Sequence, residues 1–349
     1  EDKPNFQFVL DTFASNDTTS KPLNLHIGSV LLRRVEVRWD QHWKPYADNG
    51  MFDPSHIHIK DIALTAHVRT IQNDSLNISL KRLQLNEYNG LSLKNLSFNA
   101  EIGKHGGHID KFSLQFPKSS LSIPTLLGTW THLPGNEGIK EWLKEVFWRG
   151  EMSLNLTPSD FKALVPRLAN VDTPIMLTAQ MFGSEACVNI PDISISNSGS
   201  FDFNAKAFIQ EYTTSPQYII DISRLQTNAR LQHYLTNMLN GEGKEVSPIL
   251  TRLDTLHLSG RIHISEEAQN ANLLVRNRIG NINLSAHAKR WNDLKATLHS
   301  DGLKLDHMLS DNGKHALQSV AFNVDISGKL HDKHGKPHFN INASIPHFA

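Results

Sequence analysis

Histidine is the residue type in this sequence with the most obvious capacity for chemistry, because the chain carries 19 of them. His56 and His58 lie two apart in "HIHIK", so on a β-strand both side chains would point to the same face, which we expect to be solvated. Two imidazoles could begin a zinc site, but no spacing nearby supplies a third ligand. His331, His334 and His338 in "HDKHGKPH" are interpreted as parts of a polar loop. We therefore predict no metal site.

The other reactive groups also lack the partners that catalysis needs. Cys187 lies in "EACVNI", the pattern of a strand, and is interpreted as a small, buried or half-buried residue rather than a nucleophile. "GKHGGH" is rich in glycine, but it does not join a strand to a helix in the way that a phosphate-binding loop does. The sequence contains no GxSxG or HExxH pattern. It therefore predicts neither an enzyme nor a protein that needs a cofactor.

Composition excludes several other classes of protein. Basic and acidic residues balance at 35 each, so strong attraction to nucleic acid is not expected. A single cysteine allows no internal disulfide, and no apolar run approaches the roughly 18 residues of a membrane-spanning helix. Because the sequence starts at Glu1 and stops inside the strand pattern "INASIPHFA", we expect it to be a segment of a longer protein.

Alternation of apolar and polar residues dominates the chain. In "LSLKNLSFNAEIGKHGGHIDKFSLQF" the apolar residues fall on one face, and Ser, Lys, Asn and Asp fall on the other. "GKHGG" supplies residues that accept a positive φ and so reverses the chain. A change of parity at Lys94 and Asn95 predicts a β-bulge. The pattern recurs roughly twenty times between turn residues, which predicts an all-β fold with a few short helices.

The predicted strands have no matching second layer in the sequence. Their recurrence favours a solenoid-like stack in which each unit contacts mainly its neighbours. Three apolar stripes at helical spacing predict short helices near 137–148, 158–168 and 228–240. In the second helix, Thr157, Pro158 and Asp160 resemble a capping box. We divide the chain into a first run of strands over 1–156 and a second over 157–349, within one continuous elongated segment.

Three phrases, taken in order, resemble a known family. "LNLHIGSVLLRRVEVRW" resembles the entry strands of AsmA-like proteins, and "SLKRLQLNEYNGLSLKNLSFNAEI" is similar to a phrase of the TamB branch of that superfamily. "LTPSDFKALVPRL" resembles the short helix that precedes a new run of strands in these chains. The resemblance covers most of the sequence from about Leu23 to Ile326, and its specificity lies in the order of the phrases.

The resemblance implies an elongated, curved β-sheet trough, also called a β-taco or repeating β-groove, with an apolar lining. Such proteins are anchored in the inner membrane of Gram-negative bacteria and cross the periplasm. They work with an Omp85-type outer-membrane protein, and proposed roles are phospholipid transport between the membranes and assembly of outer-membrane proteins. This segment contains neither a recognisable anchor nor the domain that meets the partner. We expect it to conduct phospholipid acyl chains.

The predicted lining consists of the apolar residues of the early strands. These residues are Ile62, Leu64, Ala66, Ile78, Leu80, Leu93, Phe98, Ala100, Phe112 and Leu114. Three other interpretations remain open at this point: a closed barrel or sandwich used for adhesion or assembly, a chaperone that binds client strands by β-augmentation, and a right-handed β-helix enzyme.

Overall fold

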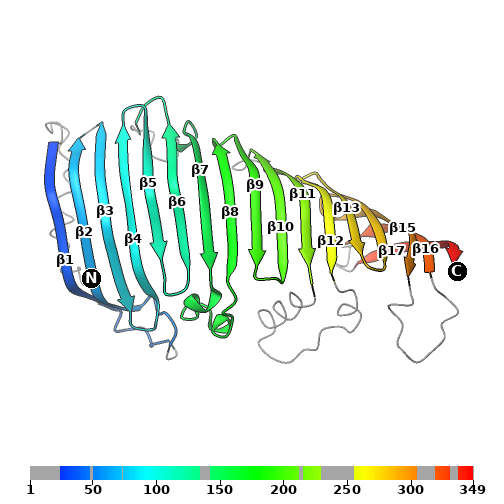
Figure 1. Ribbon diagram of the computed structural model, residues 1–349, viewed down its shortest axis with the longest axis horizontal. Helices are drawn as coiled ribbons and strands as arrows, with labels where there is room; N and C mark the ends of the chain where they lie inside the picture. The colour runs from blue at the N-terminus through cyan, green and yellow to red at the C-terminus, as the bar shows by residue number, and fades with distance from the viewer. Residues whose placement is uncertain are drawn as a thin grey trace.

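The protein folds into one antiparallel sheet of seventeen strands, in which each strand pairs with the next along the chain (Figure 1). The sheet is not closed into a barrel. The structure, a computed structural model, describes residues 24–47, 50–72, 74–133, 142–211, 215–228, 255–304, 319–330 and 337–348. The predicted all-β class is therefore confirmed.

The strands are long for a globular protein and run back and forth across the sheet. They are β1 (Asn24–Asp40), β2 (His56–Gln72), β3 (Ser75–Glu87), β4 (Ser92–Gly103), β5 (Gly106–Gln115), β6 (Ser120–Thr129), β7 (Phe147–Leu156), β8 (Ile175–Gly183), β9 (Cys187–Asn197), β10 (Phe201–Gln210), β11 (Gln217–Thr227), β12 (Leu256–Ile264), β13 (Ala268–Asn277), β14 (Gly280–Lys289), β15 (Asp293–Lys304), β16 (Ser319–Lys329) and β17 (His338–Phe348). Many connections are tight, as the predicted turn at "GKHGG" between β4 and β5 illustrates.

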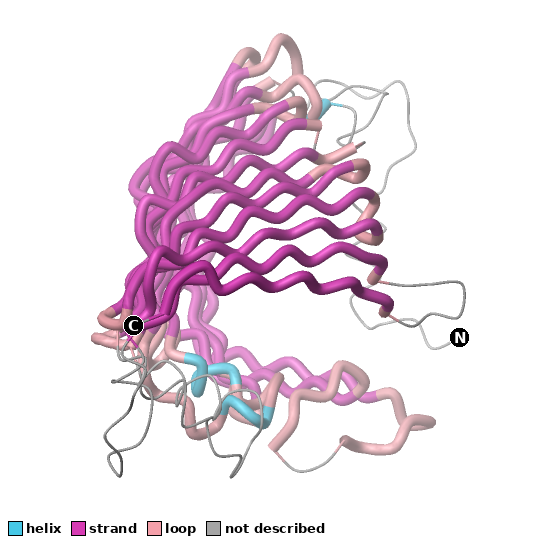
Figure 2. Tube along the Cα trace, turned by 90° about the vertical axis from the view of Figure 1, so that its right-hand side faces the viewer, coloured by secondary structure: helices cyan, strands magenta, loops and turns pink. Residues whose placement is uncertain are grey.

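The sheet curves, so that the strands follow an arc when the molecule is viewed along its long axis (Figure 2). β-Bulges in successive strands provide the local cause, because an extra residue in one strand bends and twists it. Arg34 in β1, Asp61 in β2 and Lys111 in β5 lie at such irregularities, with φ of 53°, 54° and 54°. The bulge predicted at Lys94 and Asn95 is confirmed, since these two residues of β4 oppose the single residue Gln84 of β3.

No second layer covers the sheet within the part of the chain that the structure describes. Apart from a few minor contacts, strands meet only their neighbours, and the two short helices meet each other. The accessible surface of the chain is 23131 Å², whereas a compact monomer of 39.3 kDa would expose about 14,000 Å².

The sheet continues across the predicted division at 156/157, because β7 pairs with β8.

The helix predicted near 158–168 is present as two 3₁₀ helices, η1 (Pro158–Phe161) and η2 (Pro166–Leu168). The predicted capping box is wrong, because the Thr157 side chain makes no capping hydrogen bond. Thr157 Oγ1 instead donates to the carbonyl of Lys118, and Asp160 accepts from the Lys118 amide. Pro166 lacks an amide hydrogen and so prevents the two turns from joining into one α-helix.

The other two predicted helices are only partly covered by the described residues. Trp142 and Leu143 are helical, but the predicted end at 148 is wrong, because Phe147 and Trp148 belong to β7. Both residues pair with β6 and are therefore part of the sheet. Residues 134–141 and, apart from Asn228, the helix predicted near 228–240 lie outside the described residues.

We expect the protein to be elongated in solution. A compact globule of this length would have a radius of gyration of about 20 Å. Small-angle X-ray scattering should give a clearly larger value and a rod-like distance distribution. A radius close to the compact value would contradict the single-layer architecture.

Replacing Gly260 by alanine should destabilise the fold. Gly260 has φ +144°, and a Cβ there would clash with the carbonyl oxygen of Asn272 on the neighbouring strand. The strained backbone alone should lower the free energy of unfolding by at least about 1 kcal/mol, measured by denaturant titration. Gly28→Ala is the matched control, because nothing lies within 4 Å of its added Cβ. Equal stability of the two variants would contradict the prediction.

Candidate functional site

One face of the sheet is apolar from the early strands to the last. Residues paired directly across antiparallel strands lie on the same face, so the register can be followed from strand to strand. A single row of paired apolar residues runs from β2 to β13. Its members are Leu64, Leu83, Leu96, Leu114, Leu121, Leu154, Leu177, Ile195, Phe203, Leu225, Leu258 and Val275. A neighbouring row continues through β14 to β17 as Leu273, Leu284, Leu298, Val324 and Ala343.

The ten residues predicted from the sequence all lie on this apolar face. Ala66 pairs with Leu80, and Leu80 pairs in turn with Phe98. Ile78 pairs with Ala100, and the rings of Phe98 and Phe112 stack with their centroids 6.4 Å apart. The remaining four each pair with an apolar residue of a neighbouring strand; they are Ile62, Leu64, Leu93 and Leu114.

Burial indicates that the apolar face is the inner side of the curve. In β7, Trp148, Met152 and Leu154 are half-buried, whereas the alternate polar residues are exposed, and β14 shows the same alternation. With no second layer, a side chain is covered mainly by its neighbours on the same face, and curvature crowds side chains on the inside while it spreads them on the outside. The apolar residues therefore form a trough rather than a convex surface.

The outer face carries charged residues that pair across strands. Arg261 on β12 forms two hydrogen bonds with Asp221 on β11. Just beyond the paired ends of β13 and β14, Arg290 forms two hydrogen bonds with Glu267, each 2.9 Å long. The hydrogen bonds from Arg261 hold the pKa of Asp221 below its ordinary value. All four side chains are well exposed, so these pairs add little stability and chiefly keep the outer face solvated.

An aromatic cap sits on the apolar face where β5 begins and β6 ends. The Trp130 ring lies over Gly107 and Gly128, and a Cβ at either glycine would approach it to 3.0 Å. Trp142 contacts Trp130 edge to face at 5.1 Å and donates from Nε1 to the His132 carbonyl at 2.6 Å. The sequence prediction missed Trp130, although two glycines at apolar positions of paired strands were a signal that something had to fit there.

Polar contacts hold the opposite rim, where β5 ends and β8 begins. Lys118 Nζ lies 2.6 Å from Asp172, and Phe116 contacts Phe161 edge to face at 5.1 Å. The buried Ser119 hydroxyl accepts from the backbone of Thr157. Hydrogen bonds from Lys118 and Ser159 hold the pKa of Asp172 below its ordinary value. These contacts fix the 3₁₀ segment to the rim.

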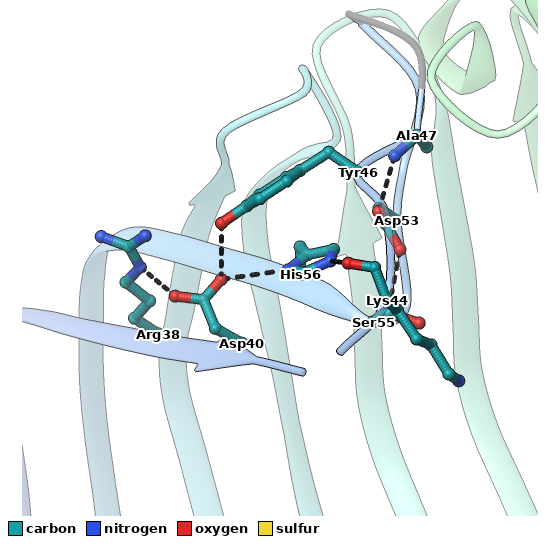
Figure 3. Close-up of polar contacts among 8 residues, drawn as sticks. All are labelled: Arg38, Asp40, Lys44, Tyr46, Ala47, Asp53, Ser55 and His56. Atoms are coloured by element: carbon teal, nitrogen blue, oxygen red, sulfur yellow. Dashed lines mark hydrogen bonds and ion pairs between the residues drawn. The ribbon is translucent and has the colours of Figure 1, made fainter. Parts of the chain in front are cut away.

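The histidine expectations divide into three outcomes. The prediction that His56 is solvated is wrong, because loop residues 41–47 and 50–55 cover it and leave only 6% of it exposed (Figure 3). His58, on the same face, bonds Glu36 at 2.5 Å. His338 begins β17, while His331 and His334 lie outside the described residues. Among the described residues, no group of three or more His, Cys, Asp or Glu is arranged to hold a metal ion.

Cys187 opens β9 and is half-buried, as predicted. None of the helices within the described ranges is long and apolar enough to cross a membrane. Comparisons with protein-family models, with curated proteins and with solved structures found no match to this chain. The family resemblance of the three sequence phrases therefore stays a prediction.

Replacement of Trp142 by alanine should test the aromatic cap. Loss of its ring contact and hydrogen bond should lower the free energy of unfolding by about 2 kcal/mol, less than for a fully buried tryptophan. Trp43→Ala is the control, because Trp43 is 75% exposed. If thermal unfolding showed no difference between the two variants, the cap would not contribute to stability.

Proposed function

We propose that the apolar trough binds lipid acyl chains and conducts them along its length. The chain would then be a periplasmic segment of a TamB- or AsmA-like protein that moves phospholipid between inner and outer membrane and supports assembly of outer-membrane proteins. The observation that carries this proposal is the apolar face that crosses the seventeen strands, over which the described part of the chain places no second layer.

Energetics support an amphiphilic ligand. Each buried CH₂ group contributes roughly 0.8 kcal/mol, so a chain of about sixteen carbons would gain on the order of 10 kcal/mol at full burial. A trough open along its length leaves a polar head group in water while it covers the tail. Movement along such a surface needs no chemical step, which agrees with the prediction that the protein is not an enzyme.

The membrane partners belong to other parts of the proposed full-length protein. An anchor outside these residues would hold it in the inner membrane, and a different region would contact an Omp85-type protein in the outer membrane. The segment described here would supply part of the path between them. A balanced charge is consistent with this role, because neutral acyl chains require no electrostatic attraction.

β-Augmentation is a second candidate function. Within the described strands, β1 pairs only with β2 and β17 only with β16, so each leaves one backbone edge for another strand. Ile341 and Ile345 on β17 are 63% and 61% exposed. Bulges and the side chains of Arg33 and Arg34 make β1 the less suitable of the two edges. The other rival, a closed β-module, is disfavoured because the sheet is open.

Photocrosslinking in cells tests the proposal. A photoreactive residue placed at Phe98 or Leu114 should crosslink phospholipid, whereas one at Ser97 or Ser113, on the opposite face of the same strands, should not. Adding Leu114→Arg should reduce crosslinking at Phe98 by at least about tenfold. An unpaired buried charge costs more than the 1.4 kcal/mol that corresponds to this factor.

The paired positions serve as matched controls, because they share strands, expression level and distance from the rims. Equal crosslinking from both faces, or none from either, would contradict the conduit. Crosslinks from β17 to peptide instead of lipid would favour the β-augmentation alternative.

A further inference from the structure

A buried histidine lies beneath the loop that joins β1 to β2. Residues 41–47 and 50–55 of this loop lie around His56, whose side chain is only 3% exposed, and the Tyr46 ring stacks on the imidazole with the centroids 3.8 Å apart (Figure 3). Asp53 holds the loop in this shape by accepting from the amides of Ala47 at 2.9 Å and Ser55 at 2.8 Å. His56 is therefore shielded from water by loop residues that the Asp53 side chain holds together.

Both ring nitrogens of His56 face groups that accept hydrogen bonds. Nε2 lies 3.0 Å from the carbonyl oxygen of Lys44, and Nδ1 lies 3.3 Å from Oδ1 of Asp40. A neutral imidazole has one N–H and one lone pair, so it can satisfy only one of these acceptors. The lone pair would face the other oxygen in a place that water cannot reach. Only the doubly protonated ring satisfies both contacts.

Two carboxylates and an aromatic ring surround His56. Asp40 approaches from β1 and Asp53 from the loop, and the Tyr46 ring offers its electron-rich face. Arg38 also bonds Asp40 and brings one positive charge to the cluster. Farther along β2, the His58 side chain is hydrogen-bonded to the Glu36 carboxylate. Burial works to raise the pKa of Asp40, but the hydrogen bonds from Arg38 and His56 outweigh it and hold that pKa below its ordinary value.

The same loop fastens two distant parts of the sheet. The amide of Phe52, in the loop, donates to the carbonyl oxygen of Ala163, next to η1, at 2.7 Å. Ala163 is only 1% exposed. The loop connects β1 to β2, whereas η1 follows β7. β2 and β7 are five strand spacings apart, and at about 4.8 Å each this amounts to about 24 Å along the sheet. The contact therefore acts as a strap over this rim of the trough.

We propose that His56 is a proton-operated latch for this strap. The protonated ring ties the loop to β1 through Asp40 and to itself through Lys44, which keeps Phe52 on Ala163. Loss of a proton breaks one of the two ring contacts and turns a lone pair toward an oxygen, so the loop lifts from the rim. This inference does not rest on lipid binding, although it would control access to the trough from this rim.

Spin labels on the two halves of the strap can test the latch. Met51→Cys in the loop and Leu164→Cys beside Ala163 supply the attachment sites, in a Cys187→Ser background that removes the single native thiol. Imidazole side chains exchange their proton between about pH 5 and pH 8. Dipolar broadening of the paramagnetic resonance spectrum should be strong at about pH 5 and should fall at least about twofold by about pH 8.

Two variants separate the latch from general effects of pH. In Asp40→Asn the amide can donate to a neutral ring, so the strap should stay closed, with strong broadening at both pH values. His58→Gln removes the neighbouring histidine and should leave the wild-type transition intact. Unchanged broadening in the wild-type protein across this pH range would overturn the proposal, as would a transition retained in Asp40→Asn or lost in His58→Gln.

Discussion

The rest of the structure depends on one constraint, which is that a single sheet keeps most of its apolar side chains on one face. Leu96 pairs directly with Leu114, and Leu114 pairs with Leu121. Because directly paired residues lie on the same face, each strand's register fixes which face the next strand's apolar residues occupy. A slip of one residue in any pair would turn that strand's apolar set toward water. Because the described residues form no second layer, the face is covered mainly by its own side chains and by the curve of the sheet.

Curvature follows from irregularities that the sequence places in charged stretches. Arg34, Asp61 and Lys111 adopt positive φ at points where a strand holds an extra residue. Bulges keep the apolar residues on the inner face while the added side chain lies on the outer one. Each bulge thus bends the sheet, keeps the apolar residues in register and places a charged side chain on the convex face.

The two rims of the trough differ in chemistry. One is capped by Trp130 and Trp142 over glycines, and the other is held by hydrogen-bonded loops that include the 3₁₀ segment and the strap. Both lie at strand ends, where backbone groups without a sheet partner must be satisfied by turns, side chains or loops. Features that distinguish this trough from a uniform sheet are therefore concentrated at the ends of the strands, while the middle of each strand supplies the continuous apolar surface.

The sequence by itself determined the all-β class, the faces of the strands and the bulge at Lys94 and Asn95, because alternation is a local property with a period of two. It also placed the ten candidate residues on one face, from parity alone. Only the tertiary structure decided the direction of curvature, the seating of Trp130 on Gly107, and the burial of His56 beneath a loop. It also replaced the predicted helix with 3₁₀ turns around Pro166. Each of these depends on contacts between residues far apart in the chain, which local periodicity does not encode.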